Sequence, residues 1–169
     1  MINSERLAIV LVLIGALSRL LHLPPNIAAV TGVTIFAGYA IRNRWIAVLV
    51  PLAAMALADV VLGWYPGVVF TYFGMAAGVF IARALLHPLT PARLIATTFL
   101  SSLTFFALSN VGVWAEGWYG YTIDGLVACF VAALPFWQSS LIADFTSTAL
   151  VFGLYLVAKR AIPSVSVSA

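Results

Sequence analysis

Residues 110–148 read NVGVWAEGWYGYTIDGLVACFVAALPFWQSSLIADFTST, and the interpretation of the whole chain depends on this stretch. It holds three of the five tryptophans and three of the five acidic residues, in a chain that is otherwise a series of apolar runs. Because polar and aromatic groups are concentrated here, we expect the stretch to contain the functional site. We interpret it as a segment that leaves a membrane, dips partly back, breaks at Pro135 and re-enters as the last membrane helix.

The composition is that of an integral membrane protein. Of the 169 residues, 64% are hydrophobic and 8% are charged, and the mean hydropathy is +1.12. Soluble domains carry about 25% charged residues. Long apolar runs without an alternating pattern predict helices and not a barrel. We therefore expect one all-α domain over residues 1–169, embedded in a lipid bilayer.

Polar breaks and prolines divide the chain into six predicted membrane helices. The first five cover residues 7–21, 26–41, 45–62, 68–86 and 94–110, and the sixth begins after Pro135. Residues 123–136 would rise only about 21 Å as a helix, less than the roughly 30 Å of a bilayer core. The predicted fold is thus a polytopic helical bundle of six transmembrane helices plus one short or re-entrant helix.

The charge pattern predicts the orientation. With six crossings, the basic residues at the helix ends fall on one side, which the positive-inside rule makes cytoplasmic together with both termini. These residues are Arg6, Arg42, Arg44, Arg83, Arg93, Lys159 and Arg160. Because the basic residues lie at helix ends and form no stripe, the net charge of +3 does not indicate nucleic-acid binding.

Two pairs of small residues allow helices to approach closely. Gly74 and Gly78 stand at GxxxG spacing, and Ala54 and Ala58 form a similar pair. Such pairs predict close packing within the bundle, with a contact to a partner subunit as the alternative.

In this topology the candidate site residues collect toward the outer face. An ionisable residue within a membrane helix costs about 3 kcal/mol or more, so we predict that Arg19 pairs with Asp59 or Asp144. Such a network is either a structural ion pair or the floor of an outward-facing substrate pocket. The candidate substrate-binding residues are Arg19, His22, Asn26, Asp59, Asn110, Trp114, Glu116, Trp118, Tyr119 and Asp144.

The aromatic residues of the loop also have two interpretations. Tryptophan and tyrosine are enriched at membrane interfaces and need no ligand there. Alternatively, residues 111–122 close as a lid over a small organic ligand. In that case Trp114, Trp118 and Tyr119 stack on the ligand, and Asn110, Glu116 or Asp144 gives polar contacts.

The chain resembles two groups of proteins. The first helix that ends in a proline turn, the string ALADVVLG at 56–63 and the string ALPFWQSSLIADF at 133–145 resemble the substrate-binding S-components of energy-coupling-factor vitamin transporters. The strings ALADVVLGW, SNVGVWAEG and CFVAALPFWQSSLIADF resemble a family of small bacterial membrane proteins of unassigned function. This resemblance implies that the chain lies in the bacterial cytoplasmic (inner) membrane.

The S-component resemblance implies six helices, a small-molecule site closed by extracellular loops, and an ATP-driven energising module in the membrane as a partner. One feature departs from it. S-components often carry an AxxxA pair in the first helix for docking that module, whereas here Ala8 is followed four places later by Val12.

Catalytic chemistry is not indicated. His22 and His87 lie on opposite sides of the membrane in this topology and cannot share a zinc ion, and we find no phosphate-binding loop or HExxH helix. We expect no enzyme, no cofactor and no metal. Two hypotheses remain: a binding protein for uptake of a small, vitamin-like organic molecule, or a small accessory or structural subunit of a membrane complex.

Overall fold

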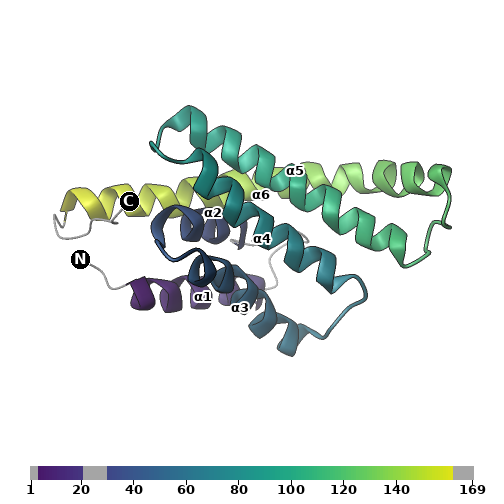
Figure 1. Cartoon of the computed structure of the whole chain (residues 1–169), viewed down its shortest axis with the longest axis horizontal. Coiled ribbons are helices and arrows are strands. Elements are labelled where there is room, and N and C mark those ends of the chain that lie inside the picture. The colour runs from purple at the N-terminus through teal and green to yellow at the C-terminus, as the bar shows by residue number, and fades with distance from the viewer. Residues whose placement is uncertain (1–3, 21–29, 162–169) are drawn as a thin grey trace.

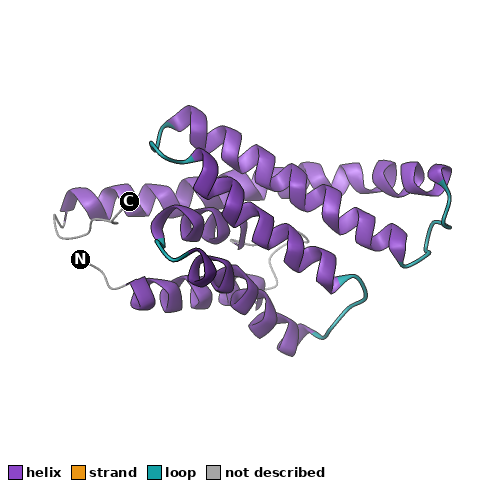
Figure 2. Cartoon of the chain, in the orientation of Figure 1, coloured by secondary structure: helices purple, strands orange, loops and turns teal. Residues whose placement is uncertain are grey.

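The computed structural model describes residues 4–20 and 30–161, and all six of its regular elements are helices. They are α1 (Ser4–Leu20), α2 (Val30–Ala40), α3 (Arg44–Leu62), α4 (Val68–Leu85), α5 (Pro91–Ala115) and α6 (Ile123–Ala161). Figures 1 and 2 show a bundle in which the connecting loops gather at two ends. The all-α class is therefore confirmed.

The helices alternate in direction. The start of α1 and the end of α6 lie at the same end of the bundle, at the left of Figure 1, together with residues 41–43 and 86–90. Residues 63–67 and 116–122 lie at the opposite end, at the right of Figure 1. Four helices, α3 to α6, are long and apolar enough to cross a membrane, which indicates a membrane protein. The helices α1 and α2 are shorter, with 17 and 11 residues.

Side chains fix the helix ends that the sequence suggested. The Asn43 side chain caps α3 by accepting hydrogen bonds from the backbone N–H groups of Trp45 and Ile46, at 2.9 and 3.4 Å. The Thr90 side chain caps α5 in the same way, and Pro91 takes the first helical position. These caps explain why the polar breaks in the sequence located α3 and the start of α5 to within three residues.

Arginines satisfy exposed carbonyl groups at the end of the bundle where α6 ends. Arg83 donates to the backbone oxygens of Ile41 and Arg42, at 2.8 and 3.0 Å, and so connects α4 to the end of α2. Arg93 donates to the oxygens of Leu85 and His87 at the end of α4 and just beyond it. Cations near helix C-termini are favourable because they meet the negative end of the helix dipole.

The helix α2 forms the centre of the bundle. It packs against each of the other five helices, and nine of its eleven residues are buried. Two glycines make this possible. A Cβ atom on Gly32 would lie 2.7 Å from the backbone carbonyl of Ser147 in α6, and one on Gly38 would lie 2.6 Å from the Val79 oxygen in α4. Only glycine allows backbones this close.

The predicted small-residue pairs also make close contacts between helices of the bundle. Gly74 faces Phe105 of α5, and Gly78 faces Thr34 of α2. Ala54 contacts α1 opposite Gly15, and Ala58 is fully buried. The prediction of close packing inside the bundle is confirmed for these pairs.

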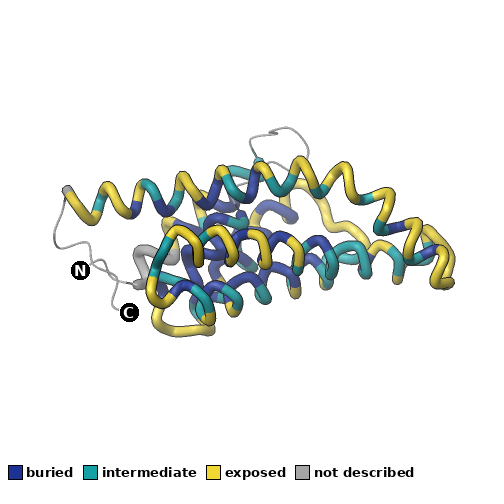
Figure 3. The backbone as a smooth tube through the Cα atoms, turned by 90° about the horizontal axis from the view of Figure 1, so that it is seen from above, coloured by how far each residue is buried: buried dark blue, intermediate teal, exposed yellow. Residues whose placement is uncertain are grey.

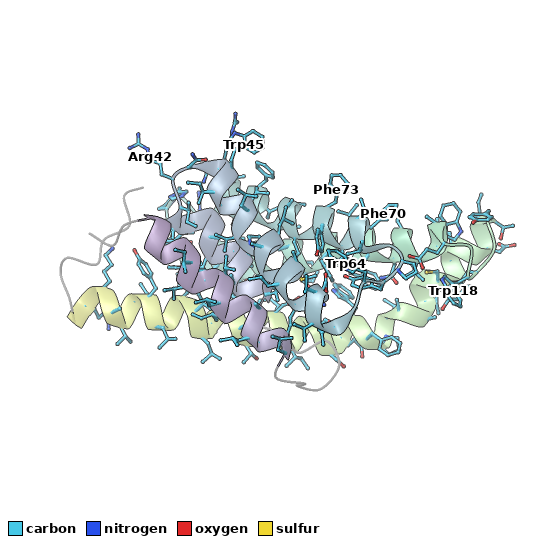
Figure 4. The ribbon with its side chains drawn as sticks, turned by 90° about the horizontal axis from the view of Figure 1, so that it is seen from below. Arg42, Trp45, Trp64, Phe70, Phe73 and Trp118 are labelled. Atoms are coloured by element: carbon cyan, nitrogen blue, oxygen red, sulfur yellow. The ribbon has the colours of Figure 1, made fainter. Side chains whose placement is uncertain are left out.

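The predicted break at Pro135 is wrong. Residues 123–136 are not a separate short or re-entrant helix but the first part of α6, which runs for 39 residues, a length of about 58 Å. Proline removes one backbone hydrogen bond and bends a helix, but neighbouring helices can hold both halves together. In Figure 4 the green N-terminal part of α6 is inclined to the yellow remainder.

The helix α5 holds α6 on both sides of this proline. The Phe106 ring meets Phe130 edge to face at 5.5 Å, before Pro135, and stacks on Trp137 at 5.0 Å, after it. Trp137 also donates a hydrogen bond to Ser102. The tertiary contacts of α5 therefore override the local signal for a break.

Candidate functional site

A cavity of about 490 Å³ lies among the helices and is lined by residues from all six of them. Its polar lining includes Arg19, Thr31, Thr71, Ser102, Asn110 and Asp144. Its apolar lining includes Met55, Met75, Phe105, Phe106, Phe136 and Trp137. Small-molecule sites usually have about 300–1,000 Å³, with apolar walls and a few polar groups, so this cavity has the size and chemistry of such a site.

An ion pair stands at one wall of the cavity. Arg19 Nη1 lies 3.0 Å from Oδ1 of Asp59, and Tyr72 donates a hydrogen bond of 2.9 Å to Oδ2. The same Arg19 nitrogen lies 2.8 Å from the Met55 sulfur. Asp59 is fully buried, so its charge depends on these partners. The predicted pairing of Arg19 with Asp59 is confirmed, and the pairing with Asp144 is not found.

Asp144 lies on another wall. It belongs to the buried stripe of α6, and the hydroxyl groups of Thr31 and Ser102 face its carboxylate. Trp137 Nε1 donates to Ser102 Oγ at 3.1 Å, which leaves the hydroxyl proton of Ser102 available for the carboxylate. The helix α1, which carries Arg19, does not pack against α6, so the cavity separates the two charged centres.

Asn110 also lines the cavity, one helical turn before the end of α5. Its Nδ2 donates to the Phe106 backbone oxygen at 2.8 Å, and Ser109 donates to the same oxygen at 3.2 Å. These local bonds fix the amide on the helix surface. Asn110, which the sequence analysis named as a candidate site residue, therefore lies in the cavity lining with its side-chain amide fixed by a local hydrogen bond.

The loop residues do not line this cavity. Glu116, Trp118 and Tyr119 line a separate shallow depression with Tyr65, Pro66 and Val113. Trp118 donates to Glu116 Oε2 at 3.0 Å, and 76% of its surface is exposed. Figure 4 shows Trp118 near the end of the bundle opposite Arg42 and Trp45.

The predicted lid segment is also shorter than expected. Residues 111–115 are the last turn of α5, so the loop itself is 116–122. Trp114 donates to the Thr122 oxygen at 3.3 Å and lines neither hollow. Among the aromatic residues at this end of the bundle, Tyr65 from the neighbouring loop lines both the cavity and the depression.

Two more predicted site residues, His22 and Asn26, fall outside the described ranges. Of the remaining eight, the structure brings Arg19, Asp59, Asn110 and Asp144 to the cavity or its wall and groups Glu116, Trp118 and Tyr119 at the depression. Trp114 joins neither group.

Sequence reasoning missed the hydroxyl and aromatic partners of these residues. The hydroxyl groups of Thr31 and Ser102 face Asp144, Tyr72 donates a hydrogen bond to Asp59, and Trp137 donates one to Ser102. A signal was present, because hydroxyl residues within apolar membrane helices commonly mark helix contacts. Within residues 4–20 and 30–161, no three His, Cys, Asp or Glu side chains come close enough to hold a metal ion.

The fold indicates a helical membrane protein, and its helices surround a cavity of small-molecule size. The chain belongs to a protein family of unknown function, DUF6580, whose profile matches residues 2–165. The expected membership in a family of unassigned function is thus confirmed. No curated protein and no solved structure matches the chain.

Proposed function

We propose that this protein binds a small organic molecule in the cavity and serves its uptake across the bacterial inner membrane, in the manner of an S-component. The observation that supports this is the cavity itself. Polar groups from α1, α2, α5 and α6 converge on a space of about 490 Å³ in a bundle that is otherwise apolar. In a membrane bundle such groups are costly unless they have a role in binding or packing.

The cavity contains groups that could orient a ligand, in addition to having enough volume for one. The ion pair of Arg19 and Asp59 and the carboxylate of Asp144 stand on walls formed by different helices. Aromatic rings in the cavity lining, among them Phe105, Phe136 and Trp137, supply apolar area for the body of a ligand. A few fixed polar groups with aromatic walls are the usual means of recognising an organic ligand.

The proposal includes an orientation. One end of the bundle carries Arg42 and His87 in its loops, Arg44 at the start of α3, and Lys159 and Arg160 at the end of α6. We assign this end to the cytoplasm with both termini. A reporter that is active only in the cytoplasm should therefore give a signal when it is fused after Lys159. A signal only from a reporter that is active outside the cytoplasm would contradict this orientation.

An energising module in the membrane is the partner that this mode of uptake requires. The alternative function, an accessory or structural subunit of a membrane complex, drew on the small-residue pairs. Gly74, Gly78 and Ala54 make their close contacts inside the bundle, so they offer no free surface to a partner subunit. We therefore rank uptake first.

Native mass spectrometry with two matched variants tests the proposal. Ala133 lines the cavity, whereas Ala132, its neighbour in α6, is exposed and does not. The parent protein, extracted gently from cells, should carry a bound organic adduct. Ala133→Trp should lose the adduct because the new ring fills the cavity, and Ala132→Trp should keep it.

An adduct retained equally by Ala133→Trp and Ala132→Trp would be a lipid on the outer surface and would contradict the proposal. Once the adduct is identified, uptake of that compound by cells should show the same difference between the two variants. Absence of any adduct from the parent protein would favour the accessory-subunit function.

A further inference from the structure

Among the described residues around the cavity, the acidic and basic side chains do not all pair. Arg19 is paired with Asp59 at 3.0 Å, and this is the single ion pair among the described residues. Asp144 has hydroxyl partners, but no described cation lies within 4 Å of its carboxylate. Among the described residues, the Asp144 carboxyl group therefore has no cationic partner.

The helices packed against α6 do not supply the missing cation. The helix α6 packs on α2 and α5. The helix α2 has no charged residue, and the one charged residue of α5, Arg93, lies in its first turn and donates to the Leu85 and His87 oxygens. A carboxylate in a residue that is only 8% exposed is costly without an opposite charge or enough hydrogen bonds.

Hydroxyl groups alone leave part of the carboxylate free. Two oxygens of a carboxylate offer about four acceptor positions. The hydroxyl groups of Thr31 and Ser102 face the carboxylate and can take two of them, and Trp137 holds Ser102 in place through its Nε1 hydrogen bond. The remaining positions suit an N–H donor from a ligand, and charged donors form hydrogen bonds about twice as strong as neutral ones.

The surrounding rings favour the same kind of ligand. Trp137 and Phe106 stack on each other at 5.0 Å and both line the cavity, as does Phe136. Aromatic faces attract cations through the ring quadrupole, and tryptophan does so most strongly. A carboxylate and aromatic faces together form a site for a cationic nitrogen on an aromatic or otherwise apolar body.

We infer that the ligand of this cavity is an organic cation, such as a protonated amine or a positively charged nitrogen heterocycle, whose charged nitrogen pairs with Asp144 while its body packs against the parts of Trp137, Phe106 and Phe136 that line the cavity. This inference rests on the proposed function, because it assigns a charge to the ligand of the same cavity. It deepens the proposal by excluding carboxylate and phosphate compounds as preferred ligands.

Three probes of nearly equal shape test the charge preference: tryptamine, tryptophol and indole-3-acetate, which carry an ammonium, a hydroxyl and a carboxylate on the same indole. Their affinities are measured from the concentration dependence of the thermal unfolding midpoint of the full-length protein in detergent. Tryptamine should bind about tenfold or more tightly than tryptophol, and indole-3-acetate should bind most weakly.

Two variants then assign the preference to one carboxylate. In Asp144→Asn the ratio of tryptamine to tryptophol affinity should fall to about one, because the charge is gone but an acceptor oxygen remains. Asp124→Asn removes an exposed acid in the first turn of the same helix, outside the cavity, and should leave the ratio unchanged. Comparing ratios removes any difference in the stability of the variants.

Tryptamine binding no more tightly than tryptophol in the parent protein would overturn the inference, even if Asp144→Asn does not fold. A preference that survives in Asp144→Asn would also overturn it. Neither result affects the proposed function, which is judged by whether Ala133→Trp loses the adduct found in cells.

Discussion

The helices α2 and α6 differ in almost every respect. The helix α2 has 11 residues, lies at the centre and buries nine of them, whereas α6 has 39 residues, lies along one side and is exposed over most of its length. Figure 3 shows α6 as a largely yellow tube beside the dark blue interior. Both are strongly apolar, so hydrophobicity does not distinguish a central helix from a peripheral one in a membrane protein.

The contact between α2 and α6 shows which residues mark the buried face of a helix. Gly32 of α2 meets the backbone of α6 at Ser147, within a stripe of buried residues that are mostly small or polar. That stripe recurs at helical spacing and consists of Ala143, Asp144, Ser147, Thr148, Phe152 and Tyr155. Outside it, α6 presents large apolar side chains such as Ile142 and Leu154. Small and polar residues mark the interior, because lipid is already as apolar as leucine.

The largest expected effect lies in the interior, on the helices that flank α2. Arg19→Ala should lower the free energy of unfolding by about 3–5 kcal/mol, because it leaves the buried Asp59 carboxylate without its cation. The double variant Arg19→Ala, Asp59→Asn should recover much of this loss. Thermal unfolding in detergent measures both, with the exposed Arg44→Ala as the control.

If Arg19→Ala and Arg44→Ala unfold at the same temperature, Arg19 and Asp59 are not coupled. The interior of the bundle would then tolerate the loss of a charged side chain as well as the exposed surface does, which would contradict the difference between buried and exposed positions described above.

A smaller effect is expected where the two helices meet. Gly32→Ala should destabilise the protein by about 1–3 kcal/mol, because the new methyl group would overlap the Ser147 carbonyl. Gly153→Ala in α6 is the matched control, because no atom lies within 4 Å of its Cβ position. It should leave stability unchanged or raise it by about 0.5–1 kcal/mol. Unfolding midpoints that move equally would show that α2 and α6 do not touch at Gly32.

The smallest effect is expected at Pro135. Pro135→Ala restores one backbone N–H in a helix that is already continuous, so stability should change by less than about 1 kcal/mol, well below the roughly 3 kcal/mol typical of proline inside a helix. Spin labels at the exposed Val127 and Leu150 should stay about 34 Å apart, less any bend, in parent and variant. A much shorter distance between the labels in the parent protein would show that the helix does break at Pro135, as the sequence predicted.

The sequence predicted the parts of the site that depend on local chemistry. Charged residues in apolar helices must find partners, so the sequence was enough to predict that Arg19 pairs with an acid. Asn110 and Asp144 were predicted as site residues for a similar reason, and the structure places both in the cavity lining. The loop aromatics were grouped with them only because they are close in sequence, and the structure places Trp118 and Tyr119 at a separate depression.

By itself, the sequence determined an apolar chain of helices with polar, capped ends, and it determined that the ionisable residues within them need partners. Those properties follow from local rules: lipid requires each helix to satisfy its own backbone, and a buried charge requires a neighbour. Only the tertiary structure decided that α2 is central, that α6 continues through Pro135 and that Asp59, not Asp144, takes Arg19. These outcomes depend on which backbones can approach at Gly32 and Gly38 and on the contacts of Phe106 across the proline, and both are set by residues distant in the chain.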